Sequence, residues 1–292
     1  EPAKEKGLVF EHRTEECSQA LQGYLLQCVR TSQEAVLAPG AYLLAAPLRI
    51  PSRLKLRGAD PGGGFVCALR PQGCRALEFI DCHHAAVSNL MIWATGDVSP
   101  DTYLYFDRTY SHVVRDVRVH LSAMTPPCTE AAITLDAASG KNNNLIFDNV
   151  IVRSDGLSYP AGYWFKPGCG TATLTAPNVE TSDIGFYWQG GRITLSNPDM
   201  ERIGRALVRA DLERIDAPVR FPCHGGTMIS AHSGFAFQFY RAVRNLTFHG
   251  TFIDTKLSQW TGYWYTPDRG SNVAFYGCAM DRDKWNAPPA CV

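Results

Sequence analysis

The sequence has no excess of either charge and no long apolar run. Its 28 basic and 28 acidic residues give a formal net charge of zero at pH 7, so electrostatic attraction does not favour nucleic acid as a partner. No apolar stretch approaches the roughly 18 residues that a membrane-spanning helix needs, so no membrane span is expected. These absences exclude two large classes of function.

Amphipathic helical stretches are also scarce. After residue 34, the apolar residues form short alternating runs rich in β-branched and aromatic side chains, not the stretches of roughly ten residues typical of helical repeats. Gly, Asn, Asp, Ser and Pro separate these runs and are typical of turns. The sequence therefore predicts an all-β protein.

A short phrase recurs along the chain: a small or polar residue, Asn or Asp, an apolar residue, any residue, and another apolar residue. Its central positions are Asn89, Asp116, Asn149, Asp183, Asn245 and Asn272. The steps between them are 27, 33, 34, 62 and 27 residues, and the step of 62 has a degenerate copy at Glu213-Arg214-Ile215 near its midpoint. A nearly constant period of about 30 residues that contains short strands indicates a solenoid.

The Asn or Asp before each strand suits a bend, because its short side chain tolerates the left-handed backbone region and can bond to its equivalent on the next coil. We predict a single right-handed parallel β-helix domain of roughly eight coils. The coils should occupy residues 35–280, after an N-terminal segment at 1–34 and before a tail at 281–292. A β-sandwich with evenly spaced strands is the alternative.

The N-terminal segment contains an amphipathic helix that begins near Cys17, with its apolar residues on one side. It leads into Pro39-Gly40-Ala41-Tyr42 and then Pro47-Leu48-Arg49-Ile50-Pro51-Ser52. This arrangement resembles the entrance of the pectate-lyase-like superfamily, closest to the branch of phage tailspikes and related polysaccharide-degrading enzymes. The resemblance implies a helix that caps the open end of the β-helix, and the tailspike analogy implies a homotrimer.

Three short strands each end in an aspartate, at Asp81, Asp107 and Asp136. Equivalent residues on neighbouring coils lie ~4.8 Å apart, so aligned aspartates would form a row of carboxylates. Hydrolysis of a glycosidic bond uses two carboxyl groups, about 5 Å apart in retaining enzymes and about 6.5 to 9.5 Å apart in inverting ones. The three aspartates are therefore candidate catalytic residues. Alternatively, each aspartate caps the turn after its strand.

Two residues near these aspartates are candidates for substrate binding. Arg108 follows Asp107 directly and could grip a carboxylated sugar, and His112 lies in the next turn. A Ca²⁺-assisted lyase, with the aspartates as oxygen ligands and Arg108 as base, is a second possibility. No Cys or His group has the spacing of a zinc site, so no metal site or cofactor is otherwise predicted.

An aromatic motif occurs twice, 100 residues apart, at Tyr163-Trp164 and Tyr263-Trp264, and Trp188 lies between the copies. Consecutive residues of a strand face opposite sides, so some of these rings should face outward. Their flat faces would suit stacking on sugar rings, and we treat all five residues as candidate substrate contacts. The alternatives are that they pack beneath loops or form a subunit interface.

The sequence contains ten cysteines, an even number that is high for a reduced cytosol. We expect an oxidising, extracellular setting with one or two disulfides, and the spacing favours Cys67 with Cys74 and Cys278 with Cys291. Free thiols buried inside the coils are the alternative.

These observations predict an extracellular or virion-associated protein that degrades a bacterial surface polysaccharide or exopolysaccharide. A glycoside hydrolase that uses carboxylates on the side of the β-helix is the leading hypothesis. The alternatives are a non-catalytic carbohydrate-binding or structural module and a uronate polysaccharide lyase.

Overall fold

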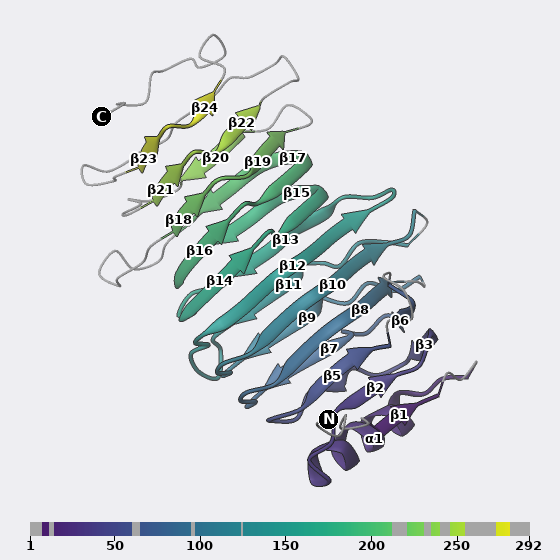
Figure 1. Cartoon of the computed structure of the whole chain (residues 1–292). Helices are drawn as coiled ribbons and strands as arrows, with labels where there is room; N and C mark the ends of the chain where they lie inside the picture. Colours follow the sequence, from purple (N-terminus) through teal and green to yellow (C-terminus); the bar gives the residue numbers. More distant parts are fainter. Residues whose placement is uncertain are drawn as a thin grey trace, which may run out of the picture.

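The computed structural model describes residues 8–11, 15–59, 65–94, 97–123, 125–211, 221–230, 235–239, 246–254 and 273–280. Strands in these ranges pair in parallel, one coil upon the next, to form an elongated stack (Figure 1). The predicted parallel β-helix is confirmed. No helix within these ranges is long and apolar enough to cross a membrane.

Each complete coil contributes one strand segment to each of three faces of the solenoid. The first face is built from β1 (Leu8–Phe10), β2 (Ala35–Leu37), β5 (Lys55–Gly58), the starts of β8 (Ala86–Ala94), β10 (Val113–Leu121) and β12 (Leu145–Ser154), β14 (Thr171–Thr175), β16 (Arg192–Ser196), β18 (Phe221–His224), β21 (Leu246–His249) and β23 (Val273–Tyr276).

The second face contains β3 (Gly40–Leu44), β6 (Cys67–Pro71), the ends of β8, β10 and β12, the starts of β15 (Asn178–Trp188) and β17 (Asp199–Ala210), β19 (Thr227–Ser230), β22 (Phe252–Asp254) and β24 (Ala279–Met280). The third face contains β4 (Leu48–Arg49), β7 (Leu77–Ile80), β9 (Thr102–Asp107), β11 (Ala131–Asp136), β13 (Tyr159–Phe165), the ends of β15 and β17, and β20 (Phe235–Phe239).

The core consists of apolar side chains that repeat in register from coil to coil. On the first face, Leu56 pairs with Val87, which pairs with Val114, which in turn pairs with Phe147, and all four are buried. The alternation of the strands sends every second residue inward, so each coil adds a layer to a continuous interior.

A left-handed residue marks the bend between the first and second faces on successive coils. The positions with positive φ are Asn89, Asp116, Asn149, Ala176, Asn197, Gly225, Gly250 and Gly277. The predicted hydrogen bonding along this row is present, because the Asn149 side-chain amide donates to the Asp116 carboxylate at 2.7 Å.

The predicted repeat follows this bend for three coils and then departs from it. Asp183 lies within the third-face segment of β15, so it is not equivalent to Asn149. The reason is that Ala176 takes this turn in the next coil, and a coil of only 21 residues, from Leu174 to its partner Leu195, then follows. The degenerate copy at residues 213–215 lies outside the described residues, as do Asn245 and Asn272.

The N-terminal helix α1 (Ser18–Arg30) lies beside β1 and β2 at the end of the stack (Figure 1). Its side chains Leu21, Leu25 and Cys28 are buried in the main core, as the amphipathic pattern predicts. Tyr24 from the same side of the helix accepts a hydrogen bond from the Val36 backbone N–H at 2.7 Å.

The expected disulfide between Cys67 and Cys74 is wrong, because both residues are free thiols. The Cys67 thiol lies 3.2 Å from the Leu37 carbonyl oxygen inside the coil, and the Cys74 thiol lies 3.3 Å from the Leu44 carbonyl oxygen. Further free thiols are buried at Cys82, Cys128, Cys169 and Cys223. The pairing of Cys278 with Cys291 involves a residue outside the described ranges.

Candidate functional site

The third face presents a row of polar and aromatic side chains along the solenoid. Register places Glu78, Tyr105, Thr134, Trp164, Tyr187 and Arg209 beside one another on successive coils. Their neighbours in the strands, such as Phe79, Phe106 and Phe165, point into the core. The alternation of each strand therefore places this row on the outward side of the third face, where Trp164 and Tyr187 are partly exposed and Glu78, Tyr105 and Thr134 are buried.

Trp164 and Tyr187 form an aromatic pair in the middle of this row. Their ring centroids are 5.1 Å apart and their planes differ by 18°. Gln189 connects the polar edges of the two rings: it accepts from Trp164 Nε1 at 2.7 Å and donates to the Tyr187 hydroxyl at 3.0 Å. Cations lie over both rings, Lys166 Nζ 4.8 Å from the Trp164 centroid and Arg209 Cζ 4.7 Å from that of Tyr187.

This arrangement differs from the prediction that the flat faces of these rings would be available to stack on sugar rings. Parallel strands bring residues in register to ~4.8 Å, close to the stacking distance of two rings, so the rings stack on each other. Their faces are occupied by the neighbouring ring and by cations, and Trp164 is only partly exposed. A ligand on this face would meet the ring edges.

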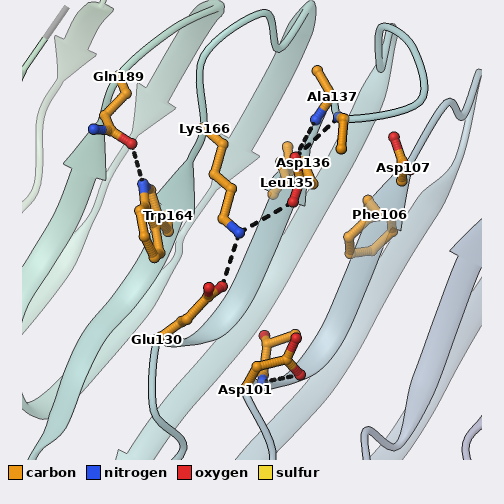
Figure 2. A network of polar contacts seen from close by, with 12 residues as sticks. Asp101, Phe106, Asp107, Glu130, Leu135, Asp136, Ala137, Trp164, Lys166 and Gln189 are labelled. Atoms are coloured by element: carbon orange, nitrogen blue, oxygen red, sulfur yellow. Dashed lines mark hydrogen bonds and ion pairs between the residues drawn. The ribbon is translucent and has the colours of Figure 1, made fainter.

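Lys166 bridges two carboxylates next to the aromatic pair. Its Nζ lies 2.9 Å from Glu130 Oε2 and 3.1 Å from Asp136 Oδ2 (Figure 2). Burial alone would lower the pKa of Lys166, but the hydrogen bonds to Glu130 and Asp136 outweigh burial and raise it. The ammonium therefore keeps its proton at neutral pH and fixes the positions of both carboxylates.

Asp107 and Asp136 are partners in register at the ends of β9 and β11. Asp136 accepts hydrogen bonds from the backbone N–H groups of Ala137 at 2.7 Å and Ala138 at 3.0 Å. Asp107 is 4% exposed and accepts from the Ser139 N–H at 3.1 Å. These contacts cap the following turns, and the register makes the two aspartates neighbours on adjacent coils.

A second ionic cluster extends the face toward the N-terminus. Arg75 donates to Asp101 Oδ1 from Nε at 2.8 Å and to Glu78 Oε1 from Nη1 at 3.1 Å. Its Cζ lies 3.7 Å from the centroid of the Tyr105 ring. Burial and the nearby charges of Asp136 and Asp107 raise the pKa of Tyr105, so this phenol stays protonated. Charged groups of both signs therefore accompany this part of the face, with Glu78 and Asp107 largely buried.

Asp81 does not join Asp107 and Asp136 in the expected row. Register pairs Asp107 with Ile80, and Asp81 lies one residue farther on, in a left-handed turn with φ of 52°. Its side chain is about half exposed and forms an ion pair with Arg108, whose hydrogen bond is the main reason that the pKa of Asp81 is lowered. Asp81 and Arg108 thus bind each other in an exposed turn.

Three predicted substrate contacts are in the interior instead. His112 is 1% exposed, and its ring accepts from the Ala85 N–H at 3.1 Å and lies 3.0 Å from the Cys82 carbonyl oxygen. Tyr163 and Trp188 are fully buried, because each occupies an inward position of its strand. Tyr263 and Trp264 lie outside the described residues.

Several residues of the site were missed from the sequence. Lys166 lies two residues after Trp164 of the aromatic motif, and the alternation of the strand gives both side chains the same outward direction. Tyr187 was detectable in the same way, beside Trp188. Glu130 and Arg75 precede their strands and gave no signal, because their place beside the row depends on how each loop enters the coil.

No protein-family model matches the sequence, and no curated protein matches it. Among solved structures, an alginate lyase from Paenibacillus sp. str. FPU-7 is 12% identical, with 93% of this chain and 99% of that chain covered and a TM-score of 0.51. A GH87 α-1,3-glucanase from Streptomyces thermodiastaticus strain HF3-3 is 10% identical, with coverages of 99% and 72% and a TM-score of 0.42.

The tailspike protein of Acinetobacter baumannii phage AM24 is 12% identical, with 94% of this chain and 54% of that chain covered and a TM-score of 0.42. Identities this low concern the fold alone. Together with the parallel pairing of successive coils, the likeness to the alginate lyase structure establishes that this chain is a parallel β-helix protein.

Proposed function

We propose that the protein is a polysaccharide-degrading enzyme whose substrate lies along the third face. The observation that supports this proposal most is that Asp107 and Asp136 pair in register beside the partly exposed Trp164. A long polymer needs an extended binding surface. Each coil of the solenoid contributes outward-facing residues to the third face, so this face extends along the stack.

Glycoside hydrolysis is the leading reaction. Carboxyl groups on adjacent parallel strands start from backbones ~4.8 Å apart, near the separation of about 5 to 5.5 Å found in retaining glycosidases. Asp136 is oriented by Lys166 and by two backbone N–H groups, so its oxygens are held in place before a substrate arrives. Glu130, on the other side of Lys166, supplies a third carboxylate within the same site.

A uronate lyase is the second candidate, favoured by the cations of this face. Lys166 and Arg209 flank the aromatic pair, where positive charge could hold the carboxylate of an acidic sugar. The solved structure with this fold and a TM-score of 0.51 is an alginate lyase. In a lyase, Ca²⁺ would be an added requirement to test.

The reaction type is tested by incubating the protein with bacterial capsular polysaccharides, exopolysaccharides and pectic polymers. New reducing ends without ultraviolet absorbance from an unsaturated sugar would identify hydrolysis. Absorbance that disappears with EDTA and returns with Ca²⁺ would move the assignment to a lyase. Binding without any product would instead identify a carbohydrate-binding module.

An extracellular or virion-surface location follows from this proposal, because bacterial surface polysaccharides lie outside the cell. The homotrimer stays a prediction from the tailspike resemblance. Light scattering of the purified protein, which gives its mass in solution against the 32.2 kDa of one chain, tests it.

A further inference from the structure

A groove with a volume of about 420 Å³ lies at the bend between the first and second faces. Its lining residues come from three successive coils and are Arg57, Gly58, Phe65, Ser88, Asn89, Arg115 and Asp116. Ligand sites commonly enclose about 300 to 1,000 Å³, so the groove has room for a small ligand. None of these residues belongs to the third face.

Two arginines flank the groove in register. Arg57 pairs with Ser88, and Ser88 pairs with Arg115, so Ser88 lies between the two arginines in the register of the strands. The strand spacing of ~4.8 Å places the two arginine backbones ~10 Å apart. Each side chain is only partly covered, with 41% of Arg57 and 57% of Arg115 exposed.

Both guanidinium groups are oriented by carboxylates behind them. Arg57 Nε lies 2.9 Å from Glu34 Oε2, and Arg115 Nε lies 2.8 Å from Asp148 Oδ2. A guanidinium group has five N–H donors, and each of these ion pairs uses the Nε position. The terminal nitrogens can therefore form the two-pronged contact that carboxylates accept.

An aromatic side chain completes one wall. Phe65 lines the groove, and Arg118 Cζ lies 4.9 Å from the centroid of its ring. The Nε atom of Arg118 is buried and has no hydrogen-bond partner. This stack fixes the orientation of Phe65, so an apolar surface stands beside the charged and hydroxyl groups.

At the groove, the backbones of Gly58 and Asn89 on neighbouring coils lie very close together. A Cβ atom at Gly58 would come within 2.2 Å of the Asn89 carbonyl oxygen, so only glycine fits there. Asn89 in turn donates its side-chain amide to the Gly58 carbonyl oxygen at 3.2 Å. The two coils are therefore in close contact where the groove crosses them.

The geometry points to a second saccharide-binding site in this groove, specific for a sugar that bears a carboxylate. The terminal nitrogens of Arg57 and of Arg115 would each bind a carboxylate on a different unit of the acidic chain. Phe65 would pack against the C–H groups of a sugar ring, and Ser88 and Asp116 would bond its hydroxyls. The site lies apart from Asp107, Asp136 and Trp164, so it does not depend on the chemistry of the third face. It would hold an acidic polymer on the enzyme while the third face acts.

The test uses oligogalacturonate and oligomannuronate tetramers, each compared with its carboxyl-reduced form. Binding is measured by calorimetry on a double variant, Trp164→Ala with Asp136→Asn, so that turnover and third-face binding are suppressed. At least one acidic tetramer should bind saturably and lose affinity as salt is added, and its reduced form should bind at least about tenfold more weakly.

Arg115→Gln and Phe65→Ala, each added to this background, should lower the affinity about tenfold, and Arg115→Lys should restore only part of it. Arg153→Gln is the matched control: Arg153 is also a partly exposed, ion-paired arginine, and it does not line the groove. Melting curves of every variant separate lost binding from lost folding. If one groove variant fails to fold, the other still decides the question.

The inference is overturned if neither acidic tetramer binds, if the reduced forms bind equally well, or if both groove variants bind like the background. Enzymatic activity without groove binding would refute this inference alone. Groove binding in a protein that degrades no polysaccharide would leave the inference standing and refute the proposed function.

Discussion

Lys166 lies over the Trp164 ring, with its Nζ 4.8 Å from the ring centroid, while Tyr187 stacks against Trp164 at 5.1 Å. On the third face, cations and aromatic rings are therefore stacked in the order Lys166, Trp164, Tyr187 and Arg209. Trp164 contacts Lys166 through its ring, and Lys166 forms ion pairs with Glu130 and Asp136. The aromatic and acidic parts of the proposed site are thus physically coupled.

Trp164→Ala should weaken polysaccharide binding about tenfold, because it removes both a ligand contact and the support of Lys166. Affinity electrophoresis in gels that contain the polysaccharide measures this loss. Trp188→Phe is the matched control, since Trp188 is fully buried. It should lower the melting temperature while leaving affinity unchanged, and equal losses of affinity in the two variants would contradict this assignment.

Acidification should destabilise the protein through His112. Burial lowers the pKa of His112 from 6.5 to about 4, so the unfolded chain binds more protons than the folded chain between these values. Its stabilising contribution is complete above pH 6.5 and is lost as pH falls toward 4, by up to about 3 kcal/mol.

Urea unfolding of wild type and His112→Gln at a series of pH values measures this effect. The variant should be less stable at pH 7 and should show a shallower loss of stability on acidification. Parallel curves for wild type and His112→Gln would show that His112 does not cause the acid sensitivity.

Ala176→Gly should stabilise the protein by about 0.5 to 1 kcal/mol. Ala176 has φ of 46°, a left-handed conformation that is strained for alanine and free of strain for glycine. The same change at Ala172, buried in β14 without a positive φ, should destabilise by about 1 kcal/mol or more. Denaturant unfolding of the two variants should therefore give shifts of opposite sign.

Cys67 and Cys74 should both react with iodoacetamide after unfolding without a reductant, because both are free thiols. Mass spectrometry of the alkylated peptides counts them directly. Dithiothreitol should leave reactivity at these two positions unchanged. A peptide pair that is alkylated only after reduction would contradict the structure.

Much of the fold could be predicted from the sequence, because a solenoid repeats its local chemistry. Asn89, Asp116 and Asn149 share a turn that needs φ above zero, and a short polar residue is visible there. The prediction failed where Ala176 takes over the same turn, since its side chain carries no polar signal. It then missed Asn197, which follows after a coil shorter than the assumed period. The coil of 21 residues also breaks the period that the earlier coils suggest.

The site was harder to predict, because one residue of register decides which side a residue faces. Asp81 and Asp107 end similar strands, yet Asp107 pairs with Ile80, so the predicted row lost a member. Tyr163 and Trp164 are adjacent, but one is buried in the core and the other lies on the outer face. Aromatic composition alone cannot assign these directions.

The most direct test of the account is the release of reducing ends by wild type, Asp136→Asn and Asp81→Asn on a polysaccharide that the wild type degrades. Loss of a catalytic carboxylate commonly costs a factor of about 10² to 10⁴, and we predict a loss in this range for Asp136→Asn. Asp81→Asn should retain wild-type activity, because Asp81 lies outside the row and is paired with Arg108. A fully active Asp136→Asn, or an inactive but folded Asp81→Asn, would contradict the placement of the active site on this face.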